Sequence, residues 1–156
     1  MKLLTSVCGV IAVLALVGIA TGQDKDAVKE EMKKLDGTWT PAWLVLKGEK
    51  KNFKVNAPIK YFGFNEVTTI KGGRMTITLE GDTLPYSITV DPTKKPKTLD
   101  RVVTEGAFKG TTYSYLYELE RDTLRLCFDN EKRDAHPKEF KSEGTLMILI
   151  FERKKP

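Results

Sequence analysis

The sequence predicts an all-β protein, an eight-stranded up-and-down antiparallel barrel with a short N-terminal helix. Segments that alternate apolar and polar residues recur along the chain, and short turns containing glycine or aspartate join most of them. The expected strands are residues 38–46, 65–70, 74–79, 84–90, 98–104, 111–119, 123–128 and 145–153. Eight such strands in chain order can close into a barrel, which removes both exposed edges. A sandwich of two sheets is the structural alternative.

Residues 1–22 have the pattern of a secretory signal peptide. Lys2 precedes an apolar run over residues 3–20, and small residues lead to an exit at Gly22. An uncleaved membrane anchor is the alternative, because the run approaches the length that crosses a bilayer. We expect cleavage after Gly22, no stable membrane span after it, and an exported protein, periplasmic or extracellular, with one β-barrel domain, residues 23–156.

A short helix is expected over residues 24–35. Val28, Met32 and Leu35 share one face at helical spacing. Acidic residues near the start and lysines at the end complement the helix dipole. The helix should pack its apolar face on the barrel.

The first expected strand and the segment after it contain two irregular features. Pro41 interrupts a strand with two tryptophans, which predicts an edge position or a bulge because proline cannot donate to the sheet ladder. Residues 47–61 are polar and basic, and we interpret them as a connecting loop with room for one helical turn. Gly72 and Gly73 then predict a hairpin, since both can adopt positive φ.

Tyr113, Tyr115 and Tyr117 form the clearest period-two pattern in the chain. They alternate with a face that carries Glu118, whose charge prefers solvent, so the tyrosines should face inward. Inside an apolar barrel their hydroxyls are polar handles for a small molecule. Alternatively they only fill the interior or cover its outer face. Leu116 shares the face of Glu118, and we expect the N-terminal helix to cover it.

The charge pattern argues against nucleic acid as a partner. The chain carries a formal charge of +5, and its denser basic runs lack the aromatic stacking residues or reading helix of nucleic-acid binders. These runs are Lys47, Lys50, Lys51 and Lys54, and then Lys94, Lys95 and Lys97. A solvated surface attracted to an acidic envelope polymer is the simpler interpretation.

The sequence offers no motif for catalysis, metal or cofactor binding. His136 is the single histidine, and the nearby Asp134 and Glu139 have no recognised metal-ligand spacing. Cys127, the one cysteine after residue 22, lies in a strand-like run and is expected to be an inert packed thiol without a disulfide. We expect no metal and no cofactor, and an enzyme ranks third among the functions considered.

A short helix, then "LDGTW", then a meander with an arginine near its end resembles the lipocalin-like superfamily. The matching positions are Gly37, Trp39 and Arg153. The resemblance implies that Trp39 lies at the floor of the barrel and that Arg153 packs over its indole in a cation–π contact.

A closer resemblance covers nearly all of the chain after residue 22. The segments "LDGTW", "LKGEK", "VDPTKKPKTLD", "YLYELERDTLRLC" and "HPKEF" are similar, in this order, to those of the secreted lipocalin-like paralogous domain of planctomycete bacteria, whose function is not established. The chain departs from that family at Arg121, where Gly is usual before Asp122, and at His136, where Arg is usual before Pro137. The resemblance implies a fold and no reaction.

Two functions of different classes follow. The first is a non-enzymatic exported protein, monomeric, that holds a small apolar or amphipathic ligand in the barrel beside the tyrosines. The second is a cell-envelope interaction module with a filled barrel, whose basic loops contact acidic polymers or partner proteins. An open or a filled interior discriminates between them.

Overall fold

The structure is a computed structural model and describes residues 22–52, 67–79 and 82–155. These residues form the helix α1 (Gly22–Leu35) and nine strands. The strands are β1 (Gly37–Leu46), β2 (Glu49–Asn52), β3 (Val67–Lys71), β4 (Arg74–Leu79), β5 (Asp82–Asp91), β6 (Lys97–Val103), β7 (Thr112–Glu120), β8 (Thr123–Asp129) and β9 (Leu146–Arg153). Residues 1–21 of the expected signal peptide lie outside the described part.

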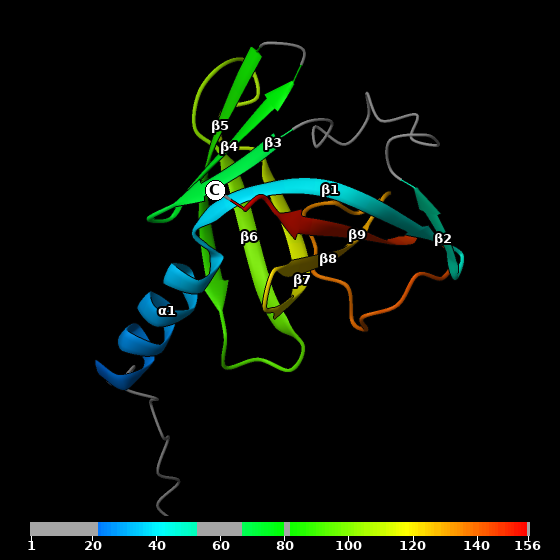
Figure 1. Cartoon of the computed structure of the whole chain (residues 1–156), viewed down its shortest axis with the longest axis horizontal. Coiled ribbons are helices and arrows are strands. Elements are labelled where there is room, and N and C mark those ends of the chain that lie inside the picture. The colour runs from blue at the N-terminus through cyan, green and yellow to red at the C-terminus, as the bar shows by residue number, and fades with distance from the viewer. Residues whose placement is uncertain (1–21, 53–66, 80–81, 156) are drawn as a thin grey trace, which may run out of the picture.

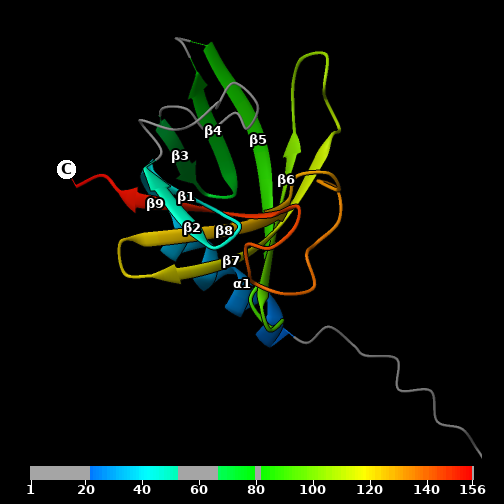
Figure 2. The ribbon, with the colours of Figure 1, turned by 90° about the vertical axis from the view of Figure 1, so that its right-hand side faces the viewer.

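Eight strands, all but β2, close an antiparallel barrel. From β3 to β9 each strand pairs with the next one in the chain, and β1 pairs with both β3 and β9. The ribbon in Figure 1 shows β1 and β9 side by side at this closure. Figure 2 shows β4 and β5 running steeply while β7 and β8 run across them, as the coiling of a closed sheet requires. The expected all-β barrel with a short helix is confirmed.

The strand β2 corrects the prediction that residues 47–61 form a loop. Residues 49–52 are extended and pair with the last four residues of β1, whereas the first three residues of β1 pair with β3. Three of the four β2 side chains are exposed, so no apolar alternation marked the strand in the sequence. It is held through the backbone ladder with β1. Residues 53–61 of the expected loop lie outside the described part.

Pro41 lies at a bulge, as predicted. The register between β1 and β9 shifts between Pro41 and Trp43, so that Pro41 is opposite Phe151 and Trp43 is opposite Ile150. A bulge lets proline sit in a strand with a neighbour, because the ladder is interrupted there anyway.

The predicted glycine hairpin is also present. Lys71 pairs with Arg74, leaving Gly72 and Gly73 as a two-residue turn with φ of 55° and 83°. A two-residue turn of this kind needs positive φ at both positions, which glycine adopts without steric cost.

The helix α1 closes one end of the barrel, which we call the helix end. At this end β1 begins and β7 and β9 finish. Leu35 is fully buried, and Val28 and Met32 pack against the same core. The amide of Gly72 donates to Asp36 just after the helix, at 2.9 Å. We call the opposite end, where β1 and β6 finish and β7 begins, the far end.

The expectation that α1 covers the outer face of the tyrosine strand is wrong. The cover is the segment 130–145, whose Phe140 packs on a second apolar cluster. The buried members of this outer cluster are Leu116, Cys127 and Ile148. Hydrophobic spacing shows that α1 has an apolar face but not which surface of the barrel that face covers. Only Asp36 separates α1 from β1, and the Trp39 indole N–H is bonded to Leu35 O, so the helix is held at the end of the barrel where β1 begins. None of the helices in the described part has the length and apolarity that a membrane crossing needs.

Candidate binding site in the barrel

The three tyrosines of β7 face the barrel interior, as predicted. Tyr115 and Tyr117 are 3% and 1% exposed and belong to the main core cluster, and the half-buried Tyr113 packs against it. The opposite face of β7 carries Ser114, Leu116 and Glu118, with Glu118 in an ion pair with Arg125 at 2.6 Å. The three rings therefore form a series from the helix end, at Tyr117, to the far end, at Tyr113.

Tyr117 is committed to the docking of α1. Its hydroxyl donates to Glu31 Oε1 at 3.2 Å, and the ammonium of Lys97 donates to the same oxygen at 2.5 Å. Lys34 reaches the other carboxylate oxygen at 3.2 Å. These bonds give the 4% exposed Glu31 side chain the partners that a buried carboxylate needs. Tyr117 is thereby a structural residue.

Burial and the neighbouring charges shift the pKa values at the helix end in opposite directions. Burial alone would raise the pKa of the Glu31 carboxyl, but hydrogen bonds from Lys97 and Lys34 outweigh it, and the net pKa is lowered. The pKa of Tyr117 is raised by burial and by the adjacent Glu31 carboxylate. Glu31 is consequently ionised and Tyr117 neutral at neutral pH.

Tyr115 lies in the middle of the series. Its ring meets Phe128 edge to face, with 5.8 Å between ring centroids and 63° between ring planes. Burial raises its pKa to about 12. Its phenol therefore stays protonated and can donate a hydrogen bond at any physiological pH.

Arg101, on β6, lies in the interior beside these rings and is 3% exposed. Its guanidinium carbon is 4.6 Å from the ring centroid of Tyr113, 4.7 Å from that of Tyr86 and 5.4 Å from that of Tyr115. Each distance is within the range of a cation–π contact. The barrel thus contains a permanently charged group within cation–π distance of three aromatic rings.

Strand register explains how these residues meet. Leu99, Arg101 and Val103 are the buried members of the alternating β6 pattern after Thr98. Arg101 pairs with Tyr113 on β7, and Val103 pairs with Tyr86 on β5. Neighbouring inward residues on adjacent strands are close enough for long side chains to touch.

Sequence reasoning missed Arg101 as a site residue. The signal was present, because Arg101 is flanked two residues away on each side by Leu99 and Val103, so it shares their face of the strand. Arg101 received no role from the sequence, because charged residues ordinarily lie at the surface and the alternation of this segment is weak. Tyr86 was likewise not connected with the tyrosines of β7, because it belongs to another strand of the sheet.

Trp39, Arg153 and Gly37 form the floor of the barrel at the helix end. The Arg153 guanidinium carbon lies 4.1 Å from the indole centroid, and the indole N–H donates to Leu35 O at 2.9 Å. Arg153 also donates to the carbonyls of Lys34 and Asp36. Gly37 has φ of 147°, and a Cβ there would be 2.5 Å from Arg153 Nη1, so this arrangement needs glycine.

His136, the single histidine, belongs to a polar cluster outside the barrel. Its Nε2 lies 3.1 Å from Asp100 Oδ1, and the Ser114 hydroxyl donates to the same oxygen at 2.6 Å. In a catalytic relay the histidine stands between the acid and the serine, whereas here the carboxylate stands between the other two. The cluster instead attaches the segment 130–145 to β6 and β7.

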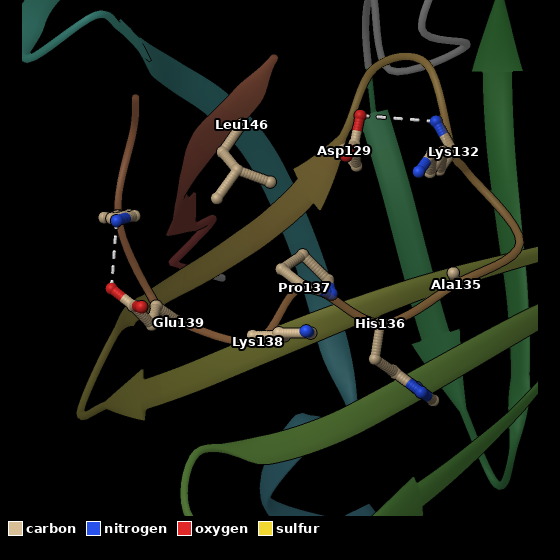
Figure 3. A pocket seen from close by; sticks show the side chains of 9 residues that line it. Asp129, Lys132, Ala135, His136, Pro137, Lys138, Glu139 and Leu146 are labelled. Carbon is tan, nitrogen blue, oxygen red and sulfur yellow. Dashed lines mark hydrogen bonds and ion pairs between the residues drawn. The ribbon is translucent and has the colours of Figure 1, made fainter. Parts of the chain in front are cut away.

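A surface depression of about 430 Å³ lies beside His136 (Figure 3). Figure 3 shows the imidazole pointing away from Leu146, with Asp129 and Glu139 on different sides of the depression. Lysines and carboxylates mix along its wall, and Lys141 pairs with Glu139 at 3.0 Å. Ala135, Pro137 and Leu146 supply apolar lining, but the mixture of charges gives the depression no dominant charge that would select a charged ligand.

The remaining candidates for chemistry are structural. Cys127 is buried in the outer cluster, its thiol donates to Lys141 O at 3.3 Å, and burial raises its pKa, so the reactive thiolate is disfavoured. Over the described ranges, 22–52, 67–79 and 82–155, no three His, Cys, Asp or Glu side chains group closely enough to hold a metal ion. Of the basic runs, Lys50 lies over the Trp43 ring at 4.3 Å and Lys97 is bound to Glu31.

No protein-family model, curated protein or solved structure matches the chain. The case for a function therefore rests on the barrel and the groups inside it.

Proposed function

We propose that this chain is an exported, non-enzymatic, lipocalin-like protein that binds a small apolar or amphipathic ligand in its barrel, at the far end. The observation that carries the proposal is the inward cluster of Tyr113, Tyr115 and Arg101. It provides hydrogen-bond donors within an otherwise apolar lining, which is the usual composition of a small-molecule site.

The packing of the helix end favours the far end for the ligand. Trp39, Tyr117, Phe151 and Leu35 are among the largest fully buried side chains, and all four lie toward α1. Toward the far end the interior residues Leu46, Tyr113 and Met147 are only partly buried. A ligand is therefore expected above Tyr115, where the lining is not fully covered.

Export is supported by the signal-peptide pattern of residues 1–22. Sequencing the amino terminus of the protein from its own host should find residue 23 first. Retention of Met1 on membrane-bound protein would contradict export in soluble form.

The ligand proposal is tested by native mass spectrometry of protein from its own host, together with titration of N-phenyl-1-naphthylamine, a neutral probe that fluoresces in apolar surroundings. We expect a co-purified small molecule and a saturable fluorescence rise. Tyr115→Phe should leave folding nearly intact and weaken binding of the co-purified molecule by about 0.5–1.5 kcal/mol, the net value of one hydrogen bond.

Tyr117→Phe is the matched control. It removes a hydroxyl from the same strand face, but that hydroxyl is bound to Glu31, so stability should fall while ligand binding stays unchanged. If neither a co-purified molecule nor probe binding is found, the proposal that the barrel binds a small molecule (the calyx proposal) fails.

The alternative, an envelope module, has separate support in the exposed Lys94 and Lys95 between β5 and β6. A paired Lys94→Gln and Lys95→Gln variant would then lose salt-sensitive binding to an acidic polysaccharide such as alginate. A variant that retains this binding argues against the module.

A further inference from the structure

We propose that the ligand of the barrel is an amphipathic carboxylate and that Arg101 binds its anionic head group. The inference rests on the proposed function and adds the chemical class of the ligand.

The first step is the position of the charge. Arg101 is as buried as the apolar side chains around it and lies on the interior face of β6 between Leu99 and Val103. Placing a guanidinium there costs desolvation energy that an apolar residue would not require for packing. A barrel that binds an anion has a use for this residue, because a carboxylate in a low-dielectric interior is stabilised strongly by an adjacent cation.

The second step is how the side chain is held. The rings of Tyr86, Tyr113 and Tyr115, on the two strands that flank β6, all lie within cation–π distance of the guanidinium. Such contacts stabilise the charge of the guanidinium and limit the positions that the side chain can adopt. A carboxylate is the anion whose two oxygens match the planar donor pair of an arginine, so a guanidinium held in place by rings is suited to it.

The third step is the charge state of the neighbours. Burial raises the pKa of Tyr86 and raises that of Tyr115 to about 12. Both phenols therefore remain neutral donors at neutral pH, and neither repels an anion. Among the described residues, the three phenol rings beside Arg101 therefore add no negative charge that would repel an anion.

The fourth step is a continuous apolar path away from the head group. Tyr115 meets Phe128, Phe128 pairs with Met147 on β9, and Met147 pairs with Leu46 on β1. Leu46 and Met147 are partly buried against the core at the far end. The tail of the ligand should cross the far end along this path, because the helix end is filled.

The test is displacement of N-phenyl-1-naphthylamine by ligands that share a ten-carbon chain: decanoate, decanol, decyl phosphate and decyltrimethylammonium. Wild-type protein should bind decanoate at least about tenfold more tightly than decanol, since a hydrogen bond to a charged group contributes about 1.5–3 kcal/mol. Tighter binding of decyl phosphate than of decanoate would overturn the carboxylate assignment. If decanol or decyltrimethylammonium binds as tightly as decanoate, the proposal that the head group is anionic is wrong.

Three variants assign the effect to residues. Arg101→Met should lose the preference for decanoate while still binding decanol, and Arg101→Lys, which keeps the charge without the planar donor pair, should retain part of it. Arg125→Met removes an equal charge from the outer face and should leave the affinities for decanoate and for decanol unchanged. Met147→Gln should weaken the binding of decanoate and decanol equally, because it removes apolar contact with the ten-carbon chain that the two ligands share.

These outcomes separate the two proposals. Probe binding without a preference for decanoate overturns the role of Arg101 and leaves the calyx in place, whereas absence of probe binding overturns the calyx itself. If Arg101→Met does not fold, the comparison of ligands on the wild-type protein and the Arg101→Lys variant still decides the question. Full preference retained in Arg101→Lys would contradict bidentate binding.

Discussion

Trp39 connects three parts of the chain at the helix end of the barrel. Its ring is covered by Arg153 from β9, and its indole N–H is bonded to the last residue of α1. Arg153 in turn bonds the carbonyls of Lys34 and Asp36, so one cation serves both the ring and the end of the helix. The loss of Trp39 therefore removes packing and a hydrogen bond together.

Trp39→Ala should lower the free energy of unfolding by about 3–5 kcal/mol, as expected for a large buried aromatic. Urea denaturation followed by circular dichroism measures it. Trp43→Ala is the control, because Trp43 is only partly buried beneath Lys50 and should cost less. Equal losses for the two tryptophans would mean that Trp39 has no special role at the floor.

The buried phenols make stability depend on alkaline pH. The folded-state pKa of Tyr115 is about 12, against an ordinary value of 10.0, so the unfolded chain loses this proton first. The contribution is complete below pH 10 and is lost as pH rises toward 12, about 1 kcal/mol for this tyrosine by pH 11. Between pH 10 and pH 12, the urea concentration at the midpoint of unfolding should fall further for the wild-type protein than for Tyr115→Phe. Parallel falls would contradict the burial of this hydroxyl.

At the scale of elements, α1 is held by a buried carboxylate. Glu31 on α1 accepts bonds from Lys97 on β6 and Tyr117 on β7, which attach the helix to two strands at once. A glutamine at this position keeps one acceptor oxygen but removes the charge and puts an N–H2 donor where the carboxylate has its second acceptor oxygen, and a buried donor without an acceptor is costly.

Glu31→Gln should lower the free energy of unfolding by about 1–3 kcal/mol, the smaller end reflecting the partial exposure of Lys97. Because the pKa of Glu31 is lowered on folding, its contribution is present above the ordinary value of 4.5 and is lost as pH falls below it. The variant should therefore lose less stability than wild type on acidification. Glu30→Gln, in an exposed pair with Lys33, is the control and should have no measurable effect.

The elements that carry alternation or turn glycines could be predicted from the sequence, and the others could not. β4 is found at its predicted bounds, and the bulge at Pro41 follows from a missing N–H. β2 was missed because its side chains are all polar, three of them charged, and its stability comes from backbone pairing with β1. Arg121, at the position where the resemblance led us to expect glycine, adopts φ of 49° and completes a two-residue turn, so a left-handed turn forms there without glycine.

At the scale of the whole molecule, barrel closure creates the candidate site. The three tyrosines and their inward direction could be predicted from one strand, because period two and Glu118 suffice for it. The position of Arg101 among them could not, since it depends on the register of β5, β6 and β7. The cover of the outer face likewise depends on long-range contacts, such as the amide of Ser114 donating to Arg133 O at 2.7 Å.

The central claim is that a ligand binds inside the barrel at the far end. Amide chemical shifts of isotope-labelled protein, recorded while N-phenyl-1-naphthylamine is added, test it most directly. The account predicts the largest changes around Tyr86, Arg101 and Tyr113, with little change around Trp39 and Glu31 at the filled helix end. Changes confined to the exposed Lys94 and Lys95, or to the depression beside His136, would contradict it.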